Sequence, residues 1–282
     1  MSVVIPTFNR VRLLRRSIES VLAQDYSGIE LIVIDGGSQD GTKDLLASYG
    51  SRIARWVSEP DHGEYNALNK GIGMCTGGVI KLMPDDDALR PGAIRSVMEW
   101  FARNPQTGVI FGQAAYWQER NGEPAHLFDT TYSPDFPFTV KDLLWQRTPY
   151  CSAAAFIRRE VFDSAGLFDE GLTNGDTEFF VRCANAGLKG AQIPEILFDY
   201  HFHSTNGVIK KLWPLYTGGV RIYCRYGYPA ALPLFAATRY FTHYLLPLLS
   251  YRYDVHPFRA LRKLRRTLTQ TQRNATGGTL AR

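Results

Sequence analysis

The sequence has few cysteines, and the four that it has lie far apart. They form no C-x-x-C pair and show no Cys/His spacing typical of zinc; they are Cys75, Cys151, Cys183 and Cys224. A disulfide framework or a structural zinc site is therefore not expected, because both need grouped or regularly spaced ligands. A reducing compartment is the default prediction.

Long uninterrupted apolar runs are also lacking. The most hydrophobic stretch, residues 228–253, contains Arg239, His243 and three prolines. A membrane-spanning helix needs about 20 predominantly apolar residues, so a spanning segment is not expected. The apolar run from Val3 ends at Pro6, which is too short for the core of a signal peptide. We therefore expect a cytoplasmic location.

Acidic residues are nearly missing from the last part of the chain. Residues 208–282 contain thirteen Lys and Arg but only one acid, Asp254, which gives this part a net charge of +12. Because the whole chain carries +5, residues 1–207 carry −7. This asymmetry predicts two regions with different partners.

The basic region also has a leucine stripe. Leu261, Leu264 and Leu268 fall on one side of a predicted helix, with Lys and Arg on the other, a pattern that suits the surface of an anionic membrane. The competing explanation is a packed helical appendix with a solvated basic face. We expect no nucleic acid as partner, because such dense aromatic and apolar runs are more typical of contacts with lipid or protein.

The first hundred residues alternate strand-like and helical patterns. The apolar runs SVVI, IELIVID, ARWVSE and GVIKLM are separated by segments with helical spacing, the first of which has Leu14, Ile18, Val21 and Leu22 on one face. This predicts an α/β fold with a mostly parallel sheet flanked by helices. Four polar turns, PTFNR, DGGSQDGT, EPDHGEYN and PDDDALRPG, follow these runs. Ligands of such sheets bind at this carboxyl edge.

The fourth of these turns contains three consecutive carboxylates, Asp85 to Asp87. At separations near 5 Å and an effective dielectric near 20, each pair of like charges repels by roughly 3 kcal/mol. No Lys or Arg adjacent in sequence offers an obvious partner, so a divalent cation is predicted. The competing explanation is a solvated acidic turn.

Six segments in order resemble the family 2 glycosyltransferases with the GT-A fold, which is Rossmann-like. They are SVVIPTFNR, IDGGSQDGT, SEPDHGEYNALNKGI, PDDDALRPGA, GLFDEGL…GDTEFFVR and YHFHSTN, and they span residues 2 to about 207. The resemblance implies an inverting enzyme that moves a sugar from a nucleotide-sugar donor, with a UDP-sugar favoured, to an acceptor hydroxyl. It also implies assistance by Mg²⁺ or Mn²⁺.

The resemblance further implies residues that bind the donor. Pro6, Thr7 and Asn9 match the loop that touches the nucleotide, and Asp35 matches a carboxylate that meets the uridine part. The family often has a second acidic residue directly after this carboxylate, whereas Asp35 is followed here by Gly36. Asp61 is expected near the nucleotide, although an N-cap of the following helix explains it equally well.

The same resemblance assigns the metal ligands. Asp87 is the strongest candidate, with Asp85 or Asp86 as its partner, and both partners are also expected near the donor. His203 matches a histidine beside the metal and diphosphate. His201 lies one strand step away on the same face, so the two histidines are open to confusion.

The catalytic base is expected at the start of a helix that opens at Asp176. Direct displacement with inversion needs a carboxylate within reach of the acceptor hydroxyl. The resemblance places Asp176 at this position, with Glu178 two residues further on. N-capping is the competing role for Asp176.

Together these features predict a GT-A domain over residues 1–207 and a basic, aromatic-rich helical extension over residues 208–282. The extension would hold the enzyme as a peripheral protein at the inner face of the cell membrane. The acceptor would be a lipid-linked glycan or a nascent surface polysaccharide. One alternative is a sugar-1-phosphate nucleotidyltransferase, although PTFNRVR lacks the expected glycines. Another is a non-enzymatic scaffold that binds membrane or nucleic acid.

Overall fold

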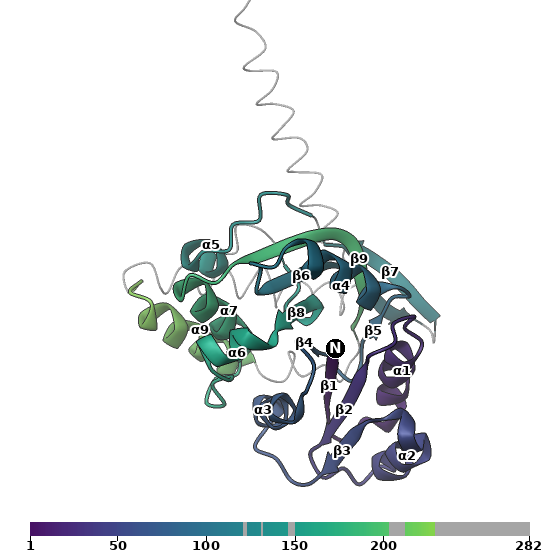
Figure 1. Cartoon of the computed structure of the whole chain (residues 1–282). Helices are drawn as coiled ribbons and strands as arrows, with labels where there is room; N and C mark the ends of the chain where they lie inside the picture. The colour runs from purple at the N-terminus through teal and green to yellow at the C-terminus, as the bar shows by residue number, and fades with distance from the viewer. Residues whose placement is uncertain (121–122, 131, 146–149, 203–211, 229–282) are drawn as a thin grey trace, which may run out of the picture. The chain divides into compact units, whose positions relative to one another are not determined.

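The computed structural model describes residues 1–120, 123–130, 132–145, 150–202 and 212–228 (Figure 1). The chain divides into two compact units, Met1–Asn206 and Gly207–Arg282. The described part of the second unit comprises helix α9 (Leu212–Arg225) and the residues next to it. The predicted leucine-striped helix lies outside the described residues. Among the helices that are described, none is long and apolar enough to cross a membrane.

The N-terminal half of the first unit alternates strands and helices as predicted. In chain order it contains β1 (Ser2–Thr7), α1 (Val11–Leu22), β2 (Glu30–Asp35), α2 (Thr42–Tyr49), the 3-10 helix η1 (Gly50–Arg52), β3 (Arg55–Ser58), α3 (Glu64–Met74) and β4 (Val79–Leu82). Strands β3, β2, β1 and β4 are neighbours in that order, and all three pairs are parallel. Their carboxyl ends therefore meet at one edge.

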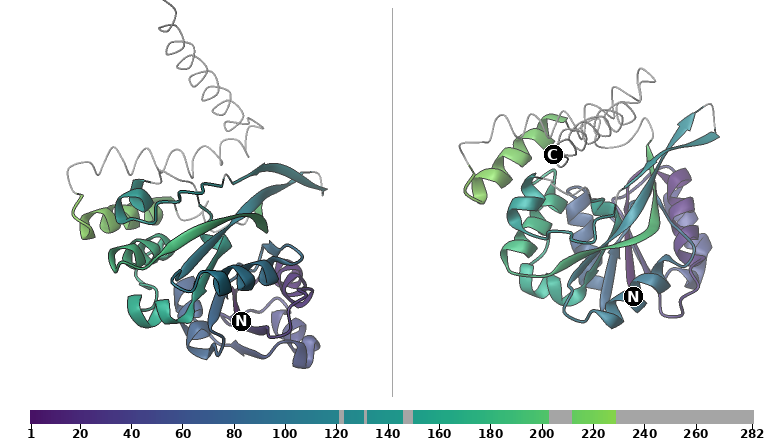
Figure 2. Two further views of the ribbon diagram at one scale, coloured as in Figure 1. Left: turned by 45° about the horizontal axis from the view of Figure 1, so that its top comes forward. Right: turned by 90° about the horizontal axis from the view of Figure 1, so that it is seen from above.

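The remaining elements of this unit make the sheet mixed. They are β5 (Ala88–Leu89), α4 (Ala93–Arg103), β6 (Val109–Arg120), β7 (Glu123–Asp129), α5 (Val140–Trp145), the 3-10 helix η2 (Ser152–Ala154), β8 (Ala155–Arg158), α6 (Arg159–Ala165), α7 (Gly175–Asn185) and β9 (Gly190–Phe202). Strand β8 runs antiparallel to both β4 and β6, whereas β9 runs parallel to β6. The sheet continues from β4 in the order β8, β6, β9, β5, and β7 forms an antiparallel pair with β6. Figure 2 shows the β6–β7 pair extending beyond the rest of the sheet.

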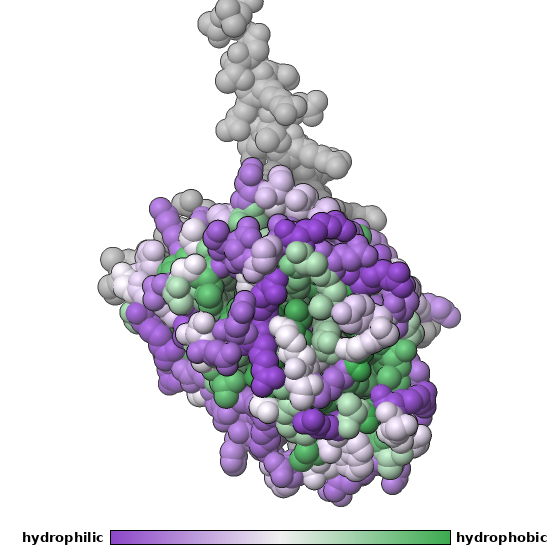
Figure 3. All heavy atoms as spheres, viewed as in Figure 1, coloured by the Kyte–Doolittle hydropathy of each residue, from purple (hydrophilic) through white to green (hydrophobic). Residues whose placement is uncertain are grey.

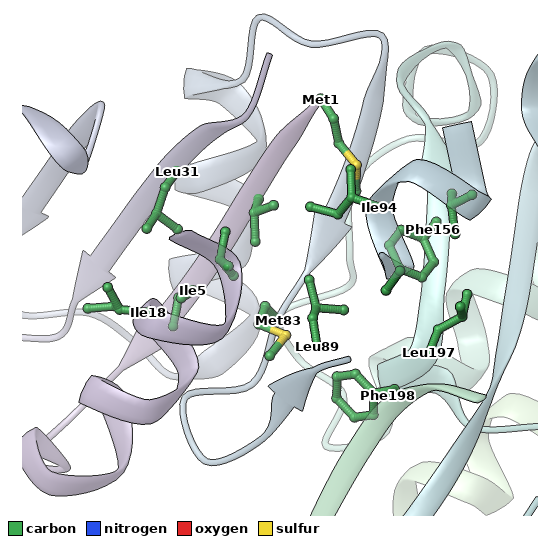
Figure 4. Packing of buried hydrophobic residues seen from close by; sticks show 14 of the residues in the cluster. Met1, Ile5, Ile18, Leu31, Met83, Leu89, Ile94, Phe156, Leu197 and Phe198 are labelled. Carbon is green, nitrogen blue, oxygen red and sulfur yellow. The ribbon is translucent and has the colours of Figure 1, made fainter. Parts of the chain in front are cut away.

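The core lies on the side of β1 that faces α1. Val3 and Ile5 of β1 belong to one buried cluster with Leu14 and Ile18 of α1, so the predicted apolar face of this helix is confirmed (Figure 4). The cluster continues through Phe156 and other residues of the mixed half of the sheet. Burying side chains on alternate strand positions contributes about 25 cal/mol per Å² of apolar surface.

Helix α3 packs very closely against the opposite side of β1. A Cβ atom at Gly71 of α3 would lie 2.3 Å from Cγ1 of Val4 and 3.3 Å from Cγ1 of Ile34. Only glycine fits at this distance, so the sequence places α3 directly against β1 and β2. This packing positions the loop that precedes α3 at the carboxyl edge of the sheet. Figure 3 shows hydrophilic and hydrophobic residues interspersed on one outer face.

Candidate active site

The loops after β1 and β4 meet at the carboxyl edge through direct hydrogen bonds. Thr7, the last residue of β1, donates its hydroxyl to Oδ2 of Asp85 over 2.8 Å. Pro6 precedes it in the strand and is partly buried. The contact places the predicted donor loop directly beside the acidic cluster.

Arg10 lies between two of the three clustered carboxylates. Its Nη1 atom is 2.9 Å from Oδ1 of Asp85 and 3.0 Å from Oδ2 of Asp86. Arg16 donates to the backbone carbonyl of Asp86. Burial opposes the charge of Arg10, but Asp85 and Asp86 outweigh this and raise its pKa. The sequence offers no adjacent Lys or Arg as a partner for the cluster, and the fold supplies Arg10 from a loop 75 positions away.

Asp87 is the deepest of the three carboxylates. It is 1% exposed, and its Oδ1 accepts the backbone N–H of His201 over 2.8 Å. Loss of solvation, with the nearby charge of Asp86, raises the pKa of Asp87 well above its usual range. Burial likewise raises the pKa of Asp85, and Arg10 opposes this rise. Asp87 thus ties the acidic loop to β9.

One of the two histidines of the sixth segment, His201, lies within the residues that the structure describes. His203 lies outside the described residues. His201 is on β9, where its Nδ1 is 3.2 Å from the carbonyl oxygen of Asp199. Burial lowers the pKa of His201 to about 4, and the positive charge of Arg16 acts in the same direction.

The carboxylates of Asp85 to Asp87 have the right chemistry for a divalent cation, but in this structure they are not arranged around a metal site. Carboxylate oxygens are the ligands that Mg²⁺ and Mn²⁺ prefer. Over the described ranges, however, no group of three His, Cys, Asp or Glu residues is arranged to hold a metal ion. One guanidinium nitrogen of Arg10 lies 2.9 Å from Asp85 and 3.0 Å from Asp86, two of the three carboxylates that would hold a cation.

Asp35 organises the turn after β2. Its carboxylate is fully buried and accepts hydrogen bonds from the backbone N–H and hydroxyl of Ser38 and from the hydroxyl of Ser58. Asn9, at a left-handed φ of 53°, joins this turn to the β1 loop, because its Oδ1 accepts the N–H of Gln39 over 2.9 Å. Asn9 and Asp35, which were both predicted to bind the donor, therefore fix the shape of the loops after β1 and β2.

Asp61 lies in the loop before α3, where it makes a local turn. The helix has Gly63 at its N-cap position, and no side chain caps it. Oδ1 of Asp61 instead accepts the N–H of Gly63 over 2.9 Å. Its other oxygen lies against Gly36, next to the ring of Phe8. Phe8 was not predicted as a site residue, although an aromatic residue in a polar loop is a recognisable signal.

Asp176 lies in the first turn of α7, partly exposed. Its Oδ1 accepts the N–H of Thr177 over 2.7 Å and lies 3.4 Å from the hydroxyl of Tyr65. The same hydroxyl accepts the backbone N–H of Asp176 over 3.1 Å. The N-cap position belongs to Asn174, which makes no side-chain capping bond. Tyr65, which the sequence did not single out, therefore fixes the position of Asp176.

Glu178 has a different environment from Asp176. It is 1% exposed and forms an ion pair with Arg182, with a distance of 2.9 Å. Arg182 also donates to the carbonyl oxygens of Ala165 and Leu167. Arg182, which pairs with the carboxylate of Glu178, thus ties α7 to the end of α6 and the segment after it.

Comparison with known proteins gives a consistent picture. The family model for glycosyl transferase family 2 matches residues 2–166. An uncharacterized glycosyltransferase of Nostoc sp., alr2836, is 31% identical over 113 residues, which are 39% of this chain and 35% of that protein. Glycosyltransferase AglE of Haloferax volcanii is 21% identical over 235 residues, covering 79% of this chain and 74% of that protein.

Solved structures share the fold. S. aureus TarS superposes with a TM-score of 0.63 at 16% identity and covers 89% of this chain, while this chain covers 43% of TarS. TarS 1-349 in complex with UDP-GlcNAc gives 0.63 at 14% identity, covering 89% of this chain and 72% of that one. Mannosyltransferase PcManGT from Pyrobaculum calidifontis, in complex with GDP-Man and Mn²⁺, gives 0.60 at 18%, covering 99% and 83%. The predicted GT-A fold is confirmed.

Proposed function

Since the chain belongs to glycosyl transferase family 2 and is a glycosyltransferase, we propose that it transfers a sugar with inversion from a UDP-sugar to an acceptor hydroxyl, assisted by Mg²⁺ or Mn²⁺. The main support for this proposal is the network at the carboxyl edge. There Thr7, at the end of β1, bonds to Asp85, and Arg10, from the loop after β1, pairs with Asp85 and Asp86. Such an edge is where α/β sheets bind their ligands.

The donor would lie over the ends of β1, β2 and β4. Pro6 and Thr7 line the first strand end, and Asn9 and Asp35 shape the loops on either side of it. A nucleotide-sugar donor is supported by structural neighbours whose complexes contain UDP-GlcNAc, UDP and GDP-Man. Arg10, whose side chain is 26% exposed, provides a positive charge at this edge for the diphosphate.

Asp87 would hold the cation with Asp85 or Asp86, together with His203. When bound, the cation would stabilise the charge that builds up on the leaving diphosphate without any proton transfer. Asp87 would keep the acidic loop in place through its bond to the N–H of His201.

Asp176 would take the proton of the acceptor hydroxyl. It is partly exposed in the first turn of α7, and Tyr65 contacts both its carboxylate and its backbone N–H. We retain Asp176 alone as the base, because the carboxylate of Glu178 is buried and paired with Arg182. A base held in a fixed position raises the rate by lowering the cost of orienting the reacting groups.

The acceptor would be a lipid-linked or surface glycan, and the enzyme would work at the inner face of the cell membrane. The support is the net charge of +12 over residues 208–282, since anionic lipids attract basic segments that also carry apolar residues.

Calorimetry tests the metal assignment. UDP is titrated into the protein with Mn²⁺ or with EDTA, and Asp86→Asn and Asp87→Asn are compared with wild type. Asparagine keeps an oxygen that can accept the N–H of His201 at position 87, so the fold should survive. We expect the Mn²⁺-dependent gain in UDP affinity to be lost in both variants and retained in Asp25→Asn, an exposed control. Equal affinities in Mn²⁺ and EDTA for wild type would exclude the metal role.

A further inference from the structure

Tyr65 joins the start of α3 to the start of α7. Its ring stacks on Phe168, with 5.4 Å between the ring centroids, and lies directly against Gly175, where a Cβ atom would come within 3.0 Å of the ring. One turn further along α3, the carboxamide of Asn69 bonds to both the N–H and the carbonyl of Phe168 over 3.0 Å. The ring of Tyr65 is therefore fixed from both sides, with its hydroxyl at the first turn of α7.

The hydroxyl of Tyr65 has one proton to donate and two acceptors within reach. Oδ1 of Asp176 lies 3.4 Å away, and the carbonyl oxygen of Thr173 lies 3.5 Å away. The charged carboxylate is the stronger acceptor of the two, and long hydrogen bonds of catalytic groups often tighten when substrate binds. The hydroxyl also accepts the backbone N–H of Asp176 over 3.1 Å. One side chain thus contacts Asp176 at two points.

The two carboxylate oxygens of Asp176 differ in their surroundings. Oδ1 accepts the N–H of Thr177 over 2.7 Å and faces the hydroxyl of Tyr65. Oδ2 receives no hydrogen bond from any residue that the structure describes, and the side chain is partly exposed. Oδ1 is therefore occupied, whereas Oδ2 is open to an acceptor hydroxyl.

These contacts replace the usual cap of α7. An N-cap side chain normally accepts the N–H of the second or third helical residue, which here are Asp176 and Thr177. Those N–H groups instead go to Tyr65 and to Asp176 itself. Asn174, at the N-cap position, is 6% exposed, and its Oδ1 has no hydrogen-bond partner among the described residues. An unpaired buried acceptor destabilises a fold, so this helix start is arranged around Asp176 at a cost in stability.

From this geometry we infer that Tyr65 is a positioning residue for the base: by holding Oδ1 of Asp176, it aims Oδ2 at the acceptor hydroxyl. This inference rests on the proposed function. The acceptor oxygen forms a bond to the anomeric carbon of the sugar while the bond from that carbon to the diphosphate breaks and its electron pair leaves with UDP. The proton of the acceptor passes to Oδ2 of Asp176, and Tyr65 keeps its own proton.

Tyr65→Phe tests this inference, because it keeps the stacked ring and removes only the hydroxyl. Turnover is measured as UDP release from UDP-sugars in Mn²⁺ with water as the acceptor, and UDP affinity by calorimetry. A hydrogen bond to a charged group changes an equilibrium or a rate by about ten- to a hundredfold, so turnover should fall by that factor. UDP affinity should stay within about twofold, because the hydroxyl acts on the base and not on the donor.

Two comparisons separate positioning from packing. In Asp176→Asn the basic oxygen is already lost, so adding Tyr65→Phe should lower turnover by less than about twofold further. Asn69→Ala loosens the same contact between α3 and the segment before α7 without touching Asp176. It should lower the free energy of unfolding and leave the turnover of the folded enzyme within about twofold of wild type.

The outcomes distinguish this inference from the proposed function. If wild type releases UDP and Tyr65→Phe is as fast, the role of Tyr65 is refuted while the glycosyltransferase remains. The same holds if Tyr65→Phe slows Asp176→Asn as much as it slows wild type, or if Asn69→Ala loses as much turnover as Tyr65→Phe. If wild type releases UDP from no UDP-sugar, both are refuted.

Discussion

At the level of single residues, one substitution at the start of α7 separates two roles of Asp176, that of catalytic base and that of a structural hydrogen-bond acceptor. If Asp176 takes the acceptor proton, Asp176→Asn should lower turnover by about 10²–10⁴-fold, because the amide keeps the size but loses the basicity. Donor affinity should barely change. The contact with the Thr177 N–H should survive, since asparagine also accepts a hydrogen bond. Steady-state kinetics together with UDP calorimetry measure both quantities.

Glu178→Gln is the matched control for this prediction. Glu178 is two residues away on the same helix but is paired with Arg182, so its loss should lower the free energy of unfolding and leave turnover of the folded enzyme close to wild type. Near-normal transfer by Asp176→Asn would remove Asp176 from the mechanism. A large loss of turnover in Glu178→Gln, with the protein folded, would direct attention to Glu178 instead.

Lys81 of β4 predicts a measurable dependence of stability on pH. Its ammonium group is fully buried, donates to the carbonyl of Ala153 and lies 4.7 Å from the centre of the Phe198 ring. Burial lowers the pKa of Lys81 to about 7, against 10.5 in the unfolded chain. Between these values the unfolded state binds the extra proton, so the cost of burying Lys81 falls and the free energy of unfolding increases as the pH rises from about 7 to 10.

Urea unfolding of wild type and Lys81→Met at pH 7.5 and 9.5 checks this expectation. The difference in free energy of unfolding between wild type and variant should shift in favour of wild type at the higher pH. A difference that is the same at both pH values would show that Lys81 titrates alike in the folded and unfolded states.

Single residues also show what the sequence could and could not predict. The three clustered carboxylates and Asp176 were recognisable, because their strand-end or helix-start positions follow from local apolar patterns. The pairing of Arg10 with Asp85, across 75 positions, was not, since it depends on β1 and β4 being neighbours in the sheet. The role of Tyr65 could not be predicted either, because its partner Asp176 is 111 positions away and only the fold brings the two together.

At the level of secondary-structure elements, the contact between α3 and β1 gives a sharp test of packing. Gly71→Ala would place a methyl group 2.3 Å from Val4, so α3 must shift, and overpacking of this kind typically costs 1–3 kcal/mol. Gly73→Ala, on the same helix, meets nothing within 4 Å and should be neutral or stabilising by about 0.5–1 kcal/mol. Thermal and urea unfolding of both variants compare the two. Equal stabilities would contradict the close approach.

The elements of the N-terminal half were predictable, and the strand directions of the second half were not. The four predicted runs became β1 to β4. Strands β1, β2 and β4 are buried, as is usual in a parallel sheet, whereas the edge strand β3 has Arg55 and Trp56 exposed. The expected mostly parallel sheet becomes mixed at β8, which runs antiparallel to β4 and β6. Apolar patterning reports burial but not direction, so the sequence could not distinguish these pairings.

At the level of the whole molecule, the charge asymmetry predicts that residues 208–282 bind the membrane while residues 1–207 carry out the sugar transfer. Removing residues 256–282, which lie outside the described residues, should release the protein from anionic liposomes and leave donor turnover unchanged. Liposome sedimentation with and without this segment measures the effect. Raising the salt concentration should weaken binding of the full chain in the same way, because the attraction is electrostatic. Unchanged sedimentation of the truncated protein would refute a membrane role for this segment.

We propose that this chain uses a UDP-sugar with a divalent cation at the edge formed by β1 and β4. Release of UDP from a panel of UDP-sugars, measured with Mn²⁺ and with EDTA, tests it most directly. We expect release from at least one UDP-sugar with Mn²⁺ and a loss of that release in EDTA. Equal release in EDTA, or release from GDP-sugars but from no UDP-sugar, would contradict it.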